Sequence, residues 1–326
     1  MSICLPRPAR WFGLVALSFL AACQTAPVAP PVPEPPEAVA PAPPPPPRIG
    51  LALGGGAARG FAHIGVIQVL EENGIRPDLV VGTSAGSLVA ALYASGKTGP
   101  ALARLADDMD ETAFTDWAFP GRGMIRGDAL ARYVRDKTSA RLIEQMPLRL
   151  GIVATDLDSG QPILFQFGDT GLAVRASSAV PAVFQPVRIG KREYVDGGLV
   201  SPVPVRFARQ MGAELIIAVD ISAAPEGNPT SDPMQMLLQT FAIMGRSINN
   251  FELRDADVVV RPKLPGVSGA DFSGRKRSIQ AGREAMLAQL PALKTKIAAK
   301  SRDAVAAKGG PSSKLEPPLG GGQGEQ

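Results

Sequence analysis

The segment 79–87 constrains the fold of this chain more than any other stretch. A strand of buried type, 79–81, leads directly into Gly-Thr-Ser-Ala-Gly at 82–86, and a helix-forming segment follows. A Gly-x-Ser-x-Gly sequence between a strand and a helix is typical of a nucleophile elbow, in which the serine sits at strained backbone angles on a sharp turn. The flanking glycines are needed because a side chain at Gly82 or Gly86 would collide with the neighbouring chain.

This turn predicts a particular chemistry for Ser84. Its hydroxyl is expected to project outward. The helix that begins at Ala85 is expected to direct its unpaired N–H groups and the positive end of its dipole toward that hydroxyl. Such an arrangement favours negative charge developing on the oxygen. An ordinary turn of small residues is the alternative interpretation, and only the rest of the chain can decide between the two.

Composition narrows the chemistry that is possible. The 326 residues include two cysteines, Cys4 and Cys23, and one histidine, His63. The folded part therefore offers neither a disulfide nor a thiolate or histidine-rich metal site, and we expect no metal and no cofactor. The net charge of +4 includes no basic stripe interleaved with aromatic residues. Nucleic acid is therefore not an expected partner.

Residues 1–22 resemble a bacterial lipoprotein signal peptide. A basic start precedes a short apolar run that ends in Leu-Ala-Ala-Cys at 20–23, which resembles a lipobox. The resemblance implies cleavage before Cys23 and lipidation of its thiol and amino group. Gln24 follows this cysteine, and a residue other than aspartate at that position resembles the pattern of lipoproteins that are transported to the outer membrane. We expect a lipid anchor in a bacterial envelope, facing the periplasm, with a plain secretory signal as the alternative.

Three further segments follow the signal. Twelve of the 24 positions from Gln24 to Pro47 are proline. Residues 23–47 therefore cannot pack a core and are predicted to be a lipidated cysteine followed by an extended tether. Residues 48–302 are enough for one α/β domain. Residues 303–326, which become rich in glycine and proline from 309 on, are predicted to be a disordered tail.

A second glycine-rich turn follows the first predicted strand of the domain. Residues 48–53 form a strand of buried type, and 54–60 lead from it into a helix that ends near Glu72. Bare backbone N–H groups in such a turn suit a phosphate or an oxyanion. A dinucleotide site would need an acidic residue after the second strand, where 82–84 read Gly-Thr-Ser. The oxyanion interpretation is therefore favoured.

The rest of the domain alternates helices and strands. Helices are predicted at 102–109, 128–137, 172–177, 203–211, 234–250 and 275–300, strands at 148–154, 162–167, 214–219 and 256–260, and a hairpin at 187–193. Three aromatic residues, Phe114, Trp117 and Phe119, suit either a lid over an apolar substrate or a plug in the core. An apolar stripe on 234–250 indicates core packing rather than a lipid groove.

Asp196 lies where a predicted strand gives way to a glycine loop, Asp196-Gly197-Gly198. Catalytic residues collect in loops at strand ends, which makes this aspartate a candidate. An aspartate that caps a turn is the structural alternative for an isolated Asp-Gly-Gly sequence.

The glycine turn, the serine elbow and the Asp-Gly-Gly loop, in this order, resemble those of the patatin-like phospholipases. The nine residues 173–181 are similar to the family's segment ahead of the aspartate. The resemblance covers most of 48–302 and implies a three-layer α/β/α fold with a mostly parallel central sheet. It also implies a Ser84–Asp196 dyad that hydrolyses acyl esters of lipids, of phospholipase A or lysophospholipase type. Small carboxylesters or thioesters are alternative substrates, and a non-catalytic scaffolding lipoprotein is the alternative class.

The position of the histidine supports a dyad independently. An α/β-hydrolase triad places its histidine after the serine, whereas His63 comes 21 residues before Ser84. Asp196 must then orient the serine and accept its proton directly. His63 is expected to be a packed structural residue.

The first glycine turn is the expected oxyanion hole. Backbone N–H groups of Gly55, Gly56 and Ala57 are predicted to bind the oxyanion, an effect worth about 3 to 4 kcal/mol per good donor. Arg59 and Gly60 are expected to support this loop. The family usually has glycine where Ala57 stands, and this is the point at which the chain departs from the pattern.

Overall fold

The computed structural model describes residues 46–109, 116, 122–267 and 272–309. The chain divides into two units, Met1–Pro43 and Pro44–Gln326, and every described residue belongs to the second. The predictions for the signal peptide, for Cys23 and for the tether up to residue 45 therefore lie outside the described residues. So do the predictions for Phe114, Trp117 and Phe119, and for the tail beyond 309.

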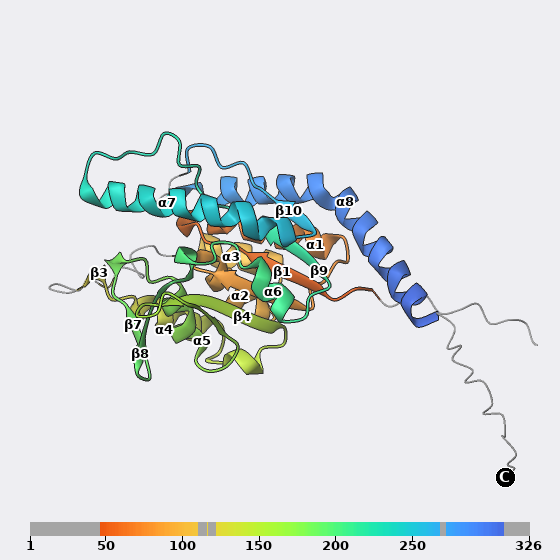
Figure 1. Ribbon diagram of the computed structural model, residues 1–326, viewed down its shortest axis with the longest axis horizontal. Helices are drawn as coiled ribbons and strands as arrows, with labels where there is room; N and C mark the ends of the chain where they lie inside the picture. Colours follow the sequence, from red (N-terminus) through yellow and green to blue (C-terminus); the bar gives the residue numbers. More distant parts are fainter. Residues whose placement is uncertain (1–45, 110–115, 117–121, 268–271, 310–326) are drawn as a thin grey trace, which may run out of the picture. The chain divides into compact units, whose positions relative to one another are not determined.

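The described residues build a three-layer α/β/α domain around one central sheet (Figure 1). The sheet consists of β1 (Ile49–Leu53), β2 (Leu79–Thr83), β4 (Arg149–Asp156), β5 (Pro162–Phe165), β7 (Val187–Ile189), β8 (Arg192–Asp196), β9 (Leu215–Val219) and β10 (Val258–Val260). The strand order is β10-β9-β1-β2-β4-β8-β7, and β5 pairs with β4. The strands from β10 to β4 in this order run parallel. Strands β5 and β8 pair antiparallel with β4, and β7 pairs antiparallel with β8. A separate parallel pair, β3 (Gly123–Ile125) with β6 (Ala182–Phe184), was not predicted.

Helices cover both faces of the sheet, which explains why its parallel strands are apolar without alternation. The helices are α1 (Phe61–Glu72), α2 (Ala85–Ala94), α3 (Gly99–Asp107), α4 (Asp128–Lys137), α5 (Thr170–Ser177), α6 (Val205–Gln210), α7 (Pro233–Glu252) and α8 (Arg275–Gly309). Because side chains alternate along a strand, Leu51 and Leu53 pack in the core shared with α1 and α2. Ala52 packs in the opposite core, which also contains Phe207 of α6.

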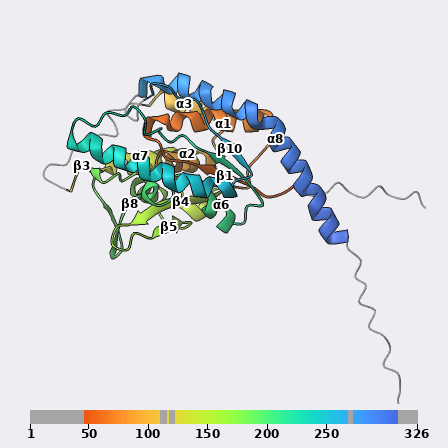
Figure 2. The ribbon, with the colours of Figure 1, turned by 45° about the horizontal axis from the view of Figure 1, so that its top comes forward.

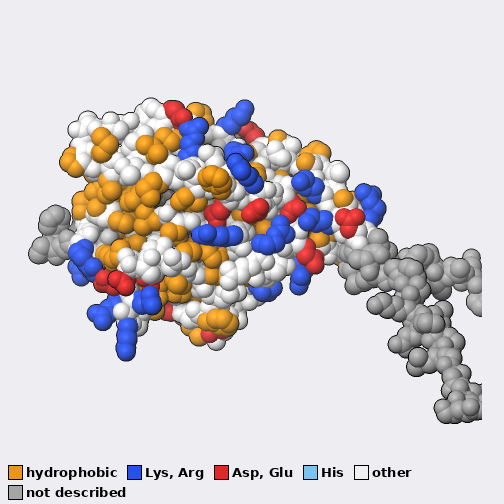
Figure 3. All heavy atoms as spheres, in the orientation of Figure 1, with side chains coloured by type: hydrophobic (Ala, Val, Ile, Leu, Met, Phe, Trp, Pro, Cys, Tyr) orange, Lys and Arg blue, Asp and Glu red, His pale blue; other side chains and the backbone are white. Residues whose placement is uncertain are grey.

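Helix α7 differs from the prediction that its apolar stripe packs in the core. Its buried residues are Gly245 and Asn249, neither of which belongs to the stripe. Among the apolar side chains, Leu238, Met244 and Ile243 are exposed, and apolar side chains gather on the face that α7 crosses (Figure 3). The core interpretation is wrong because α7 contacts the short turns η4 (Gly197–Leu199) and η5 (Leu253–Asp255), which are too small to cover the stripe.

Helix α8 is longer than predicted. It continues to Gly309, past the predicted helix end near Lys300 and the predicted domain boundary at 302. Pro291 lies within it, and a proline removes one helical hydrogen bond and favours a bend, such as the one visible along α8 in Figures 1 and 2. Within the described part of the chain, no helix is both long and apolar enough to cross a membrane.

Helices α1 and α8 lie side by side (Figure 2). Their backbones approach closely at Gly65 and Gly282. A methyl group at Gly65 would overlap the carbonyl oxygen of Ile279, and one at Gly282 would overlap the carbonyl oxygen of Ala62. The outer helix layer therefore depends on the absence of two side chains.

We predict that Gly65→Ala or Gly282→Ala lowers the free energy of unfolding by about 1–3 kcal/mol, because the two backbones must separate. Urea unfolding followed by circular dichroism measures the change. Gly245→Ala is the matched control, since a methyl there meets Pro202 at an ordinary 3.5 Å. Alanine at this interior helical position should add roughly 0.5–1 kcal/mol. Equal stability of Gly65→Ala and Gly245→Ala would contradict the packing argument.

Candidate active site

The sheet brings the three predicted loops to one place. Strands β1 and β2 are parallel neighbours with Leu53 opposite Gly82, so the glycine turn and the elbow leave the same edge of the sheet. A methyl group at Gly55 would stand only 3.2 Å from Cβ of Ser84. On the other side of β2, β4 pairs with β8 and places Ala154 opposite Asp196. Asp196 therefore ends its strand beside the elbow.

The backbone at Ser84 has the strained conformation that the sequence predicts. Its φ is 53° and its ψ is −125°, in a region that residues with a side chain rarely adopt. A methyl group at Gly82 would overlap the carbonyl of Gly86, and one at Gly86 would overlap the carbonyl of Leu53. The predicted collisions are confirmed, and both glycines are required by the turn.

Ser84 and Asp196 are joined by a direct hydrogen bond. The Ser84 hydroxyl donates to Oδ2 of Asp196 at 2.7 Å. The other carboxylate oxygen, Oδ1, accepts the N–H of Gly198 at 2.7 Å and so caps η4. The hydroxyl of Thr155 donates to the Asp196 carbonyl at 2.8 Å. Asp196 thus caps a turn with one oxygen and orients the serine with the other.

Burial adjusts the basicity of this carboxylate. Asp196 is 7% exposed, and burial raises its pKa to about 6, although the hydrogen bonds from Ser84 and Gly198 act in the opposite direction. A carboxylate is ordinarily a weak base, with a pKa of about 3.9. The raised pKa brings it closer to the value that suits a general base near neutral pH.

The oxyanion loop is only partly as predicted. The N–H of Gly55 donates to the carbonyl of Pro202 at 2.9 Å, so Gly55 has no free donor and its predicted role is wrong. The N–H groups of Gly56 and Ala57 stay available, because neither makes a hydrogen bond within the described residues. The same holds for Ala85, the first residue of α2, which was not predicted to belong to the oxyanion hole. Gly56, Ala57 and Ala85 are therefore candidate donors for an oxyanion.

Ala57 adopts a backbone conformation that favours glycine. Its φ is 50°, in the left-handed region, and its side chain is exposed. An alanine in this region costs roughly 1–2 kcal/mol. The alanine at position 57 therefore adds strain to the loop, and the left-handed turn is still present.

Arg59 fastens the loop from the other end, as expected. Its Nε donates to the carbonyl of Gly56 at 3.2 Å. Burial lowers the pKa of the guanidinium, and the nearby carboxylate of Asp220 acts against that effect. A methyl group at Gly60 would meet Cβ of Ala85 at 3.0 Å, so this glycine lets η1 (Ala57–Gly60) lie close against the elbow helix.

His63 has the surroundings of a structural residue. Its ring is fully buried in α1, and its Nε2 lies 2.8 Å from the carbonyl oxygen of Gly54. A carbonyl oxygen only accepts, so Nε2 carries the proton and donates it. Burial lowers the pKa of His63 to about 4, which keeps the ring neutral. The histidine therefore holds the start of the glycine turn.

Two supports of the elbow were not predicted as site residues. The N–H of Ser84 donates to the hydroxyl oxygen of Ser177 at 2.8 Å, and that hydroxyl donates to the carbonyl of Val153. Behind the elbow, Thr83 donates to the carbonyl of Ser201 at 2.9 Å. The only sequence signal for Ser177 was its place in the 173–181 segment.

The second support continues to the end of α7. The hydroxyl of Ser201 donates to the carboxylate of Glu252 at 2.8 Å, and Nε of Arg206 lies 3.0 Å from the same carboxylate. Burial raises the pKa of Glu252 to about 7, against the effects of Ser201 and Arg206. No spacing in the sequence signals this contact, because Ser201 and Glu252 come from separate elements 51 positions apart.

The fold and the site define an α/β/α protein with a serine that is hydrogen-bonded to a buried carboxylate. Within the described residues, no group of three His, Cys, Asp or Glu side chains is arranged to hold a metal ion. The sequence profile described as patatin-like phospholipase matches residues 51–209. The chain belongs to the patatin-like phospholipase family.

Relatives of this chain include bacterial and mammalian proteins. An uncharacterized NTE family protein of Mycobacterium tuberculosis is 36% identical over 200 residues, which cover 60% of this chain and 55% of the relative. Patatin-like phospholipase domain-containing protein 6 of Mus musculus is 33% identical over 186 residues, 55% of this chain and 14% of that protein. The crystal structure of VipD from Legionella pneumophila superposes with a TM-score of 0.52 at 16% identity, covering 76% of this chain and 67% of VipD, and shows a shared fold.

We predict that Asp196→Asn stabilises the folded protein at neutral pH. The raised pKa means that ionising Asp196 costs the folded state free energy, and the cost grows as pH rises from about 3.9, the unfolded value, to about 6. Asparagine carries no charge, so the variant should gain up to about 3 kcal/mol above that window and little below it. Urea unfolding at a series of pH values measures the difference.

Asp156→Asn is the control of opposite sign. Hydrogen bonds from Ser159 and Arg192 lower the pKa of Asp156 to about 2, so its charge stabilises the fold. This variant should be less stable than the wild type at neutral pH, with the difference shrinking as pH falls toward 2. If Asp196→Asn shows no pH-dependent gain, burial does not raise the pKa of Asp196.

Proposed function

We propose that this protein is a serine hydrolase that cleaves carboxylic esters of lipids, of phospholipase A or lysophospholipase type, through a Ser84–Asp196 dyad. The observation that carries the proposal is the 2.7 Å hydrogen bond from the strained Ser84 to a buried carboxylate. Membership of the patatin-like phospholipase family supports a lipid ester as the substrate. The chain spans about half the length of its mycobacterial relatives, so its activity is argued from its own site.

The geometry is suited to acyl transfer in two steps. Ser84 Oγ attacks the ester carbonyl carbon while its proton passes to Asp196 Oδ2, and the oxyanion is held by the N–H groups of Gly56, Ala57 and Ala85. The protonated Asp196 then gives its proton to the leaving alcohol oxygen, and an acyl-serine remains. Water attacks the acyl carbonyl and loses a proton to Asp196. Asp196 then gives that proton to Ser84 Oγ as the fatty acid leaves, which restores both residues.

The same two steps serve a small carboxylester or a thioester, because only the leaving group differs. A scaffolding protein that has kept the fold without turnover is the remaining alternative. Hydrolysis of a bacterial lipid extract with product identification by mass spectrometry separates these possibilities. Release of free fatty acid supports a lipid hydrolase, release from small esters alone supports a carboxylesterase or thioesterase, and no release from either supports a scaffold.

We predict that Ser84→Ala abolishes ester hydrolysis and leaves the fold intact, because alanine fits the same turn and lacks the nucleophile. Asp196→Asn should be nearly inactive, since an amide does not accept the serine proton. His63→Gln is the control and should keep most activity, because its amide can still donate to the Gly54 carbonyl. Rates on a chromogenic ester, with circular dichroism as the folding check, test the set. Wild-type turnover by folded Ser84→Ala would refute the assignment, and a dead His63→Gln would refute the dyad.

We also propose that the mature protein is anchored by lipid on Cys23 in the bacterial outer membrane, facing the periplasm, and that the proline-rich residues 24–47 hold the domain away from the anchor. The support is the Leu-Ala-Ala-Cys sequence at the end of a short apolar run. Several acyl chains on one residue anchor firmly, whereas a single chain binds only marginally.

Cys23→Ser should leave the precursor unlipidated, because the serine hydroxyl replaces poorly the thiol that accepts the lipid. Membrane fractionation and mass measurement of the mature protein report the outcome. Cys4→Ser, in the other cysteine of the chain, should change neither result. An unmodified residue 23 in the wild-type protein would rule out the anchor.

A further inference from the structure

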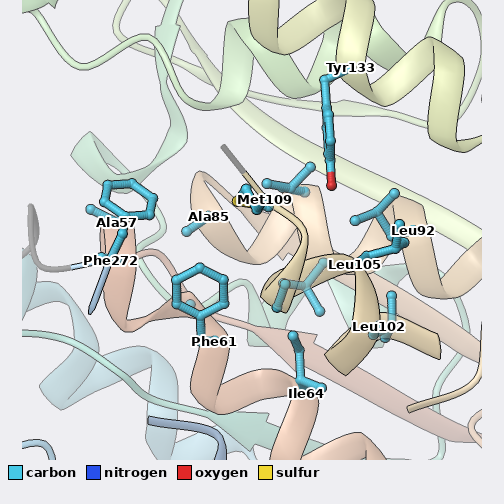
Figure 4. A pocket seen from close by; sticks show the side chains of 15 residues that line it. Ala57, Phe61, Ile64, Ala85, Leu92, Leu102, Leu105, Met109, Tyr133 and Phe272 are labelled. Carbon is cyan, nitrogen blue, oxygen red and sulfur yellow. The ribbon is translucent and has the colours of Figure 1, made fainter. Parts of the chain in front are cut away.

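A small apolar pocket lies beside the oxyanion donors (Figure 4). It is bordered by η1, α1, α2 and α3, and by Tyr133 of α4 and Phe272. Ala57 and Ala85, whose N–H groups are left for the oxyanion, lie on one side, and Leu92 and Leu102 lie on the other. The pocket therefore begins next to the place that the carbonyl of a bound ester occupies in the proposed mechanism.

The lining of the pocket selects hydrocarbon. Of its fifteen lining residues, all of them described, Tyr133 alone carries a polar side-chain atom, and none carries a charge. Such a wall cannot satisfy the hydrogen bonds of a phosphate or a sugar, so a lipid head group is excluded. Burying one methylene group of a ligand in such a wall favours binding by a free energy of about 0.8 kcal/mol.

The pocket is short. From Ala85 to Leu92, α2 advances about 10 Å, at 1.5 Å per residue. The side chains of Ile64, Leu92 and Leu102 are almost fully buried on this part of the wall. The cavity volume of the pocket, counted as the space available to water-sized groups, is about 60 Å³. One such group needs about 10–15 Å³, so the pocket holds a chain of roughly four to six methylene-sized groups.

We propose that this pocket binds the acyl chain of the substrate and that its length makes the protein prefer hexanoyl and octanoyl esters to butyryl and palmitoyl esters. The inference rests on the proposed function, because it names the acyl group that the same site takes. Between butyryl and hexanoyl, kcat/KM should rise about fourfold per added methylene, which corresponds to the free energy of burying it. An octanoyl chain fills the pocket, so the gain from hexanoyl to octanoyl should be smaller. Longer chains cannot be buried completely, so the rise should end and then reverse.

Two variants change the size of the pocket in opposite directions. Ala106→Leu adds bulk to a buried lining position on α3 and should lower kcat/KM on octanoyl ester at least tenfold while leaving butyryl ester within about twofold. Leu105→Ala removes bulk at a half-buried lining position, where the fold tolerates the loss, and should move the optimum toward lauroyl ester. Leu287→Ala is the matched control, an exposed leucine of α8 outside the lining, and should leave the profile unchanged.

The experiment measures kcat/KM on p-nitrophenyl butyrate, hexanoate, octanoate, laurate and palmitate. A palmitate optimum in the wild type, or an equal loss on all five esters in Ala106→Leu, would overturn the inference. If Ala106→Leu does not fold, Leu105→Ala decides, and an unshifted optimum in that variant counts against the pocket.

If the wild type hydrolyses no ester, the proposed function fails, and the pocket is then tested by calorimetry of sodium octanoate binding to Ser84→Ala. Ala106→Leu in that background should weaken binding about tenfold, and unchanged or absent binding would refute the pocket.

Discussion

The strained backbone at Ser84 is the constraint on which the rest of the site depends. A non-glycine residue at φ 53° and ψ −125° persists only where its surroundings over-determine it. Here the surroundings act on three sides. Gly86 sits against the carbonyl of Leu53, Ser177 accepts the N–H of Ser84, and Thr83 is bonded to Ser201. The conformation that exposes the hydroxyl is therefore enforced by β1, α5 and the loop after Asp196.

Burying the carboxylate of Asp196 costs the folded state free energy, as the strained backbone at Ser84 does, and the two costs are linked. A buried aspartate is tolerated when its oxygens are bonded, and Asp196 receives bonds from Ser84 and Gly198. The bond from Ser84 exists only because the elbow aims the hydroxyl at the end of β8. Strain at the serine thus helps to satisfy the aspartate, while incomplete compensation leaves the carboxylate the raised pKa that suits a base. Stability and reactivity oppose each other at this pair.

Local patterns predicted most elements and the Ser84–Asp196 pair that the fold brings together, and they failed where contacts are distant. Helix α4 has the predicted bounds, 128–137, because its apolar residues repeat at helical spacing. Ser84 and Asp196 were found because each lies in a loop of recognisable chemistry. The loss of Gly55 as a donor could not be foreseen, since its partner Pro202 is remote in sequence. The exposure of α7 also escaped prediction, because an apolar period does not reveal whether a partner covers it.

The glycine turn shows how the protein keeps a strained oxyanion loop with an alanine in it. Gly54 and Gly55 are fixed by bonds to Val219 and Pro202, which belong to β9 and to the loop beyond Asp196. On the other side, Arg59 holds the carbonyl of Gly56. Because both flanks are held, the chain between them cannot relax to the α or β region that alanine prefers, and the left-handed turn at Ala57 persists. In the proposed mechanism, N–H groups fixed in this way need no reorganisation when charge develops, which is the condition under which an oxyanion hole is most effective.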